Sequence, residues 1–140
     1  MNKPPTWFTV VAVIALLWNL LGLFAVGADI SLSAADIAAL PSEQQALHAA
    51  RPGWSIAGSA IAVVMGTSGC VLLLLRKKWS IYAFALSLVG IVLQDLGLFG
   101  AAGSAQSLGP VVVGMQAMVA VIALALLLLS RKALASAWLQ

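Results

Sequence analysis

Long apolar runs dominate the chain, and short polar connections separate them. A helix needs about 20 apolar residues to cross a hydrocarbon core of about 30 Å, because its backbone groups must all find hydrogen-bond partners within the segment. Four runs reach that length, at about residues 7–26, 54–75, 80–99 and 111–129, and Asp95 is the one charged residue inside them. The pattern therefore predicts an all-α integral membrane protein, a four-transmembrane-helix bundle in which residues 1–140 form a single membrane domain.

The composition agrees with a membrane environment. Hydrophobic residues make up 63% of the 140 residues and charged residues 8%, whereas soluble domains contain about 45–50% apolar and about 25% charged residues. A soluble domain of this size leaves much of its surface in contact with water, so it could not hide so many apolar side chains. We therefore expect the lipid bilayer to be the main partner of the chain.

The basic residues stand in small groups at the ends of the apolar runs. Lys3 precedes the first run, residues 76–78 join the second and third, and Arg131 with Lys132 follow the fourth. Lysine and arginine accumulate in cytoplasmic loops, and an even number of spans brings all three groups to one side. This arrangement predicts cytoplasmic termini. Because topology accounts for the net charge of +3, that charge does not indicate binding to nucleic acid.

A cleaved signal peptide is the alternative interpretation of the first run. Lys3 would supply its positive start, and Ala25 with Gly27 would supply the small residues of a cleavage site. The run is longer than the roughly 7–15 apolar residues of a signal peptide. Cleavage would also leave three spans, and the basic groups would no longer share one side. The pattern favours a membrane span.

The polar stretch of residues 29–52, between the first two runs, contains two helix-start patterns. Ser33 stands three residues before Asp36, and Ser42 stands three before Gln45, and both pairs resemble capping boxes. Pro41 cannot continue a helix and should separate the two, and the proline at 52 should end the second. We expect a short helical extracytoplasmic segment.

Two roles for this outer segment remain open. Its apolar residues are suited to a cap packed over the outer end of the bundle or to a place along the lipid interface. A more specific hypothesis makes it a lid or docking surface that responds to pH through His48, the single histidine. A lone histidine in a loop is more often simply solvated.

Four polar residues are expected in the outer half of the bilayer, and they form our candidate substrate-binding set: Asn19, Gln94, Asp95 and Gln116. A charge such as that of Asp95 costs about 2.5–3.5 kcal/mol on insertion scales and raises a functional question by default. One interpretation is that these side chains hydrogen-bond across helices. The other is a shared pocket for a polar solute or a proton.

Small residues recur every four positions along the second run, at Gly58, Ala62, Gly66 and Cys70. Such a stripe lets two helices approach closely, within one chain or between copies of it. Cys70 has no second cysteine to pair with and is interpreted as a packing residue. The sequence contains no pattern typical of a metal site, a cofactor site or a catalytic site, so we expect neither metal, cofactor nor enzymatic activity.

Several short motifs resemble one known family. They are residues 5–8 (PTWF), 17–22 (LWNLLG), 40–41 (LP), 74–79 (LLRKKW), 84–89 (FALSLV) with Gln94, and 109–110 (GP). Together they cover nearly the whole chain and resemble small bacterial four-helix inner-membrane proteins loosely labelled sugar transporters. The resemblance implies a bacterial inner (plasma) membrane. Asp95 departs from the family pattern, which has an apolar residue after the glutamine, so the resemblance favours Asn19 and Gln94 over Asp95.

Two functions follow as hypotheses. The first is a non-enzymatic accessory or structural protein that packs within a larger membrane complex. The second is a homo-oligomeric transporter of a small polar solute such as a sugar, which would need a second copy because one four-helix bundle has few elements to move against each other.

Overall fold

The described part of the chain in the computed structural model, residues 2–102 and 105–140 without the side chains of residues 43 and 101–109, is helical. Its elements are α1 (Thr6–Ile30), α2 (Ala34–Ala38), α3 (Ser42–Ala50), α4 (Gly53–Leu74), α5 (Ser80–Ala102) and α6 (Ala105–Ala135). Of these, α1, α4, α5 and α6 include four stretches that are long and apolar enough to cross a membrane. The all-α prediction and its four apolar helices are confirmed.

The helices extend beyond the predicted spans. α1 continues to Ile30, and α5 continues to Ala102. α6 begins at Ala105, so Pro110 lies inside this helix rather than at its start. Between the predicted spans 80–99 and 111–129, residues 100–102 and 105–110 are therefore helical. Proline removes one helical hydrogen bond, which did not end the helix here.

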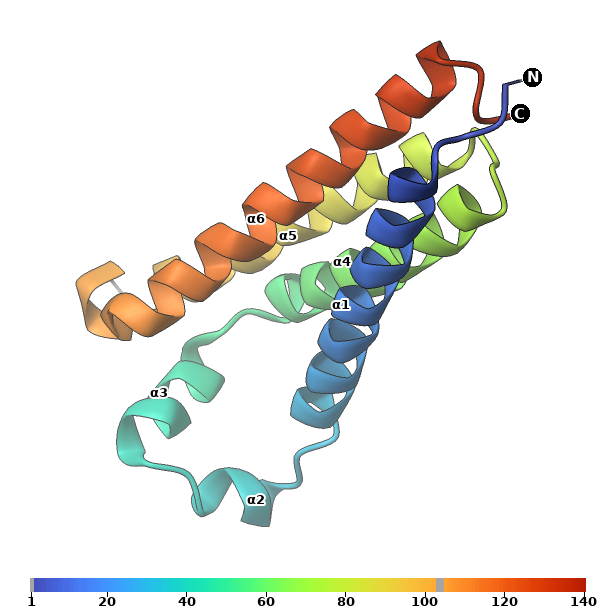
Figure 1. Cartoon of the computed structure of the whole chain (residues 1–140). Helices are drawn as coiled ribbons and strands as arrows, with labels where there is room; N and C mark the ends of the chain where they lie inside the picture. The colour runs from blue at the N-terminus through green and yellow to red at the C-terminus, as the bar shows by residue number, and fades with distance from the viewer. Residues whose placement is uncertain (1, 103–104) are drawn as a thin grey trace.

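α4 and α5 form the centre of the bundle, with α1 packed on α4 and α6 packed on α5 (Figure 1). The close contact of α4 with α5 depends on glycine. A Cβ atom on Gly90 would lie 2.6 Å from the backbone oxygen of Gly58 and 2.7 Å from the backbone nitrogen of Ala62. All four residues of the predicted small-residue stripe are buried. The stripe therefore serves packing within this chain, as the first of its two interpretations predicted.

The two chain termini and the α4–α5 turn meet at one end of the bundle (Figure 1). Arg76 has a φ of 60° and follows the last turn of α4, where the Lys77 N–H donates to Leu72 O at 2.8 Å. Ala137 has the same φ after α6, where the Trp138 N–H donates to Ala133 O at 2.9 Å. Both are Schellman-type helix ends, which turn the chain sharply.

These turns are tied together by hydrogen bonds and aromatic contacts. Arg76 donates from Nε to Trp138 O at 3.0 Å and from Nη2 to Asn2 O at 2.7 Å. The Trp138 ring packs edge-on against Phe8 and Trp7, with ring centroids 5.2 Å and 5.8 Å away. All three basic groups of the sequence lie at this closed end, which we call the basic end.

The outer segment at the opposite end contains one of the two predicted capping boxes. The Ser33 hydroxyl accepts from the Asp36 N–H at 3.1 Å, and the Asp36 carboxylate accepts from the Ser33 N–H at 3.0 Å. These two hydrogen bonds hold the pKa of Asp36 below its ordinary value. α2 therefore begins as predicted.

The prediction of a second capping box, at Ser42 and Gln45, is wrong. α3 begins after Pro41 without a side-chain cap, and Ser42 is already its first residue. The Gln45 side chain instead donates to Ala38 O at 3.0 Å and to Leu40 O at 2.7 Å. It thus binds carbonyl groups at the end of α2, which had no helical partner, and fixes the turn at Pro41.

The outer segment does not close the bundle. α3 contacts α5, whereas α2 packs on α3 and lies beyond the end of α1 (Figure 1). All of the α2 side chains except the half-buried Ile37 are exposed. Of the two places expected for this segment, over the outer end or along the lipid interface, α3 thus takes the first by packing on α5.

Candidate functional cavity

A cavity of about 410 Å³ lies among the four long helices. Its wall is mostly apolar and is built from α1, α4, α5 and α6: Trp18, Asn19, Leu21, Gly22, Ala25, Val26, Ala62, Val63, Gly66, Phe84, Ser87, Ile91, Gln94, Met115, Gln116, Val119, Ile122, Ala123 and Leu126. Small-molecule sites commonly occupy about 300–1,000 Å³, with apolar walls and a few fixed polar groups. The cavity has the size and lining of such a site.

The cavity is open at the side and closed toward the basic end. Leu21 on α1 and Met115 on α6 both line it, yet they are 68% and 49% exposed, so the wall reaches the surface where α1 and α6 are apart. Toward the basic end, a cluster that includes Phe8, Leu73 and Phe84 fills the space between the helices. A molecule could thus enter from the side without passing through the bundle.

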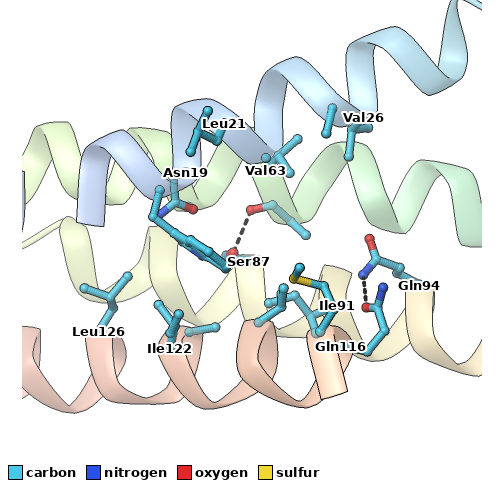
Figure 2. A pocket seen from close by; sticks show the side chains of 18 of the residues that line it. Asn19, Leu21, Val26, Val63, Ser87, Ile91, Gln94, Gln116, Ile122 and Leu126 are labelled. Atoms are coloured by element: carbon cyan, nitrogen blue, oxygen red, sulfur yellow. Dashed lines mark hydrogen bonds between the residues drawn. The ribbon is translucent and has the colours of Figure 1, made fainter. Parts of the chain in front are cut away.

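At the inner limit of the cavity, Asn19 and Ser87 belong to the packing of the helices. Asn19 donates from Nδ2 to Ala15 O at 2.9 Å and to Cys70 Sγ at 3.5 Å. Ser87 donates to Ala62 O at 2.7 Å (Figure 2). Gly66 leaves room for the Asn19 side chain, because a Cβ at that position would collide with Asn19 Oδ1. These polar groups hold α1 and α5 against α4.

Nearer the outer end, Gln94 and Gln116 connect α5 with α6. Gln94 Nε2 donates to Gln116 Oε1 at 2.9 Å (Figure 2). Interhelical hydrogen bonds in membrane proteins contribute on average about 0.6 kcal/mol. Each amide has two N–H donors and a carbonyl acceptor, and their mutual bond uses one donor of Gln94. Both interpretations of these residues, structural bridge and polar contact for a ligand, therefore remain compatible with the geometry.

A second cavity of about 180 Å³ adjoins the first at the outer end. Ala25, Val26, Gln94 and Gln116 line both cavities. The remaining wall contains four polar and three apolar residues: Asp29, Ile30, Arg51, Ser55, Ile56, Ser59 and Leu98. The inner cavity is thus mostly apolar, the outer cavity has more polar groups, and four residues belong to both walls.

An ion pair lies in the wall of the outer cavity. Arg51 donates from Nη2 to the Asp29 carboxylate at 2.9 Å and connects the end of α1 with the segment before α4. His48 contacts both residues, with its Nε2 3.6 Å from Asp29 Oδ1 and its Nδ1 3.4 Å from Arg51 Nη2. His48 is thus part of this cluster rather than a solitary loop residue, although it does not line the cavity.

The structure brings three of the four predicted site residues to one cavity. Asn19, Gln94 and Gln116 line it, whereas Asp95 lines neither cavity. Asp95 follows Gln94 on α5 and so points about 100° away from it. The Asp95 Oδ1 atom is buried and has no hydrogen-bond partner among the described residues.

Sequence reasoning missed the Asp29–Arg51 pair. The two charged residues are 22 positions apart, and this separation gave no local signal that they meet. In the part of the chain that the structure describes, no three residues of the types His, Cys, Asp and Glu gather closely enough to hold a metal ion.

Comparison of the chain with protein-family models, curated proteins and solved structures found no match.

Proposed function

We propose that this protein is a multi-pass membrane protein that binds one amphipathic molecule taken from the bilayer. The apolar part of the ligand lies in the larger cavity, and its polar part lies toward Gln94 and Gln116. The four long helices span the membrane, with the basic end on the cytoplasmic side. The resemblance described above supports placing the protein in a bacterial inner membrane.

The observation that carries this proposal is an apolar cavity that opens between α1 and α6 and is blocked toward the basic end. In a membrane, the side openings of a helix bundle face lipid, so a molecule with an apolar body can enter without being desolvated. A strongly hydrated solute would have to exchange its water for a wall that offers few polar groups, which is unfavourable. The chemistry of the wall thus favours an amphipathic ligand.

A small polar solute such as a sugar is the second candidate ligand. The outer cavity favours it, because Asp29, Arg51, Ser55 and the two glutamines supply both donors and acceptors there. In the transporter hypothesis, a homo-oligomer would carry the solute across. The blocked inner half means that this arrangement of the helices would have to change before a solute could pass.

The accessory role in a larger membrane complex stays a prediction. The outward face of α1 exposes apolar residues such as Ile14 and Phe24, at 61% and 79%. Lipid covers such residues as well as a partner helix does, so this face does not show whether α1 contacts lipid or another protein. Binding of an amphipathic molecule is compatible with a place in a complex.

Native mass spectrometry of the purified protein tests the proposal, with monoolein as the amphipathic probe and glucose as the polar probe. We expect one monoolein per chain and no retained glucose. Val119 lines the cavity on α6, and Val121 is 66% exposed and does not. We expect Val119→Trp to fill the cavity and weaken monoolein binding about tenfold or more, whereas Val121→Trp leaves it unchanged.

A second pair of variants tests the same cavity independently, in case Val119→Trp does not fold. Met115 and Met118 are similarly exposed, at 49% and 52%, and only Met115 lines the cavity. Met115→Trp should weaken monoolein binding relative to Met118→Trp. Retention of glucose without monoolein would reject the proposed ligand class. Equal monoolein binding by the two variants of each pair would reject the cavity as the binding site.

A further inference from the structure

The polar outer cavity carries a charge pattern that narrows the class of ligand. Asp29 and Arg51 lie in its wall as a hydrogen-bonded pair. The net charge of the pair is zero, so a purely anionic or cationic head group would be attracted by one member and repelled by the other. A zwitterionic group can instead place each of its charges beside the opposite member of the pair.

Both members of the pair retain binding capacity. Arg51 uses Nη2 for Asp29, and its Nε atom is buried without a hydrogen-bond partner among the described residues. His48 contacts both residues as well, at Asp29 Oδ1 and at Arg51 Nη2. Arginine has five N–H donors, and an ionised carboxylate can accept about four hydrogen bonds, so each residue keeps positions that neither its partner nor His48 uses. An additional acceptor near Arg51 and an additional donor near Asp29 would therefore be bound without breaking the pair.

The distance between the polar and the apolar parts fits one leaflet of a bilayer. From Asn19, at the inner limit of the cavity, to Asp29 is ten residues along α1, which corresponds to about 15 Å at the rise of an α-helix. This is about half of a hydrocarbon core of about 30 Å. A lipid with its head group at Asp29 and Arg51 would place its acyl chain beside Asn19, where the packed cluster stops it.

From this placement we infer that the ligand is a phospholipid with a zwitterionic phosphoethanolamine head group. Its phosphate contacts Arg51, its ammonium contacts Asp29, and one of its acyl chains fills the apolar cavity. The inference rests on the proposed function and specifies its ligand. A primary ammonium is required, because it donates hydrogen bonds to a carboxylate, whereas a trimethylated ammonium has no N–H.

Three probes with the same oleoyl chain test this inference in detergent solution: lysophosphatidylethanolamine, lysophosphatidylcholine and monoolein. We expect the wild-type protein to bind the first about tenfold more tightly than the other two, because it alone forms both charge-assisted contacts. Phosphoethanolamine without a chain is the fourth probe, and we expect no retained binding because the apolar contact is missing.

Two single variants separate recognition from structural support. Arg51→Gln and Asp29→Asn should each reduce lysophosphatidylethanolamine binding to the level of monoolein and leave monoolein binding unchanged. A purely structural role of the pair would instead weaken all chain-bearing probes equally. That result, or equal wild-type affinity for the three probes, overturns the inference while leaving the proposed function intact. If no chain-bearing probe binds, the proposed function fails as well.

Discussion

The packing of α4 against α5 allows a quantitative prediction for Gly90→Ala. The added Cβ would lie 2.6 Å from Gly58 O and 2.7 Å from Ala62 N, whereas ordinary van der Waals contact begins at 3.4 Å. Both neighbours are backbone atoms, which cannot rotate away. The two helices must therefore separate locally by about 0.8 Å, and gaps of that size forfeit roughly a quarter to a half of each contact's attraction.

The expected cost follows from two opposing terms. Overpacking a close interface costs about 1–3 kcal/mol, and the rigid neighbours place Gly90→Ala near the upper end. Alanine has a better helix propensity than glycine by about 1 kcal/mol, which offsets part of that cost. We expect a net loss of about 2 kcal/mol in the free energy of unfolding.

Gly114→Ala is the matched control for this measurement. It also changes a glycine inside a predicted span, but among the described residues, apart from its chain neighbours and the nearby backbone of α6, nothing lies within 4 Å of a Cβ at that position. Only the propensity term applies there, so stability should rise by up to about 1 kcal/mol. Unfolding by sodium dodecyl sulfate in mixed micelles, followed by circular dichroism, measures both variants. If Gly90→Ala is as stable as Gly114→Ala, the close approach of α4 to α5 is not as described.

Three further predictions concern other parts of the chain. Ala137→Gly should stabilise the protein by about 0.5–1 kcal/mol in the same unfolding assay, because the exposed alanine at φ 60° pays a steric cost that glycine avoids. Ser33→Ala should raise the pKa of Asp36 toward its ordinary value, as measured by NMR titration. Because the pKa of Asp36 is lowered in the folded protein, the capping box stabilises α2 fully at pH values above the unfolded-state pKa of about 3.9. This stabilisation is lost as the pH falls through the lower pKa of the folded state. Asp95→Asn should increase stability, because it removes a charge from a predicted span where the buried Asp95 Oδ1 has no partner among the described residues. Monoolein binding, measured by mass spectrometry, should not change, because the Asp95 side chain lines neither cavity.

The helices could be predicted from sequence because their signal is local. Apolar length alone marks the four long helices, and the spacing of Ser33 and Asp36 marks the start of α2. The small-residue stripe at Gly58 and its neighbours also predicted close packing. These features depend on residues within one turn or one helix, so no knowledge of the tertiary arrangement was needed.

The site was predictable only in part, because its residues meet through tertiary contacts. Gln94 and Gln116 were both expected in the outer half of the bilayer, and in the structure they are joined by a hydrogen bond. The same reasoning grouped Asp95 with them, although adjacent residues on a helix point in different directions. Gln45 shows the same limitation, since its capping pattern was outweighed by the free carbonyl groups of α2, which the sequence did not place beside it.

The contrast between the two ends of the bundle explains why the cavity lies where it does. At the basic end, short turns and the Arg76 hydrogen bonds hold α1, α4 and α6 together. At the outer end, residues 31–52 connect α1 with α4 by a long segment, and Arg51 and His48 of this segment contact Asp29 at the end of α1. The same two side chains, Asp29 and Arg51, therefore supply charge to the wall of the outer cavity and attach this segment to the end of α1.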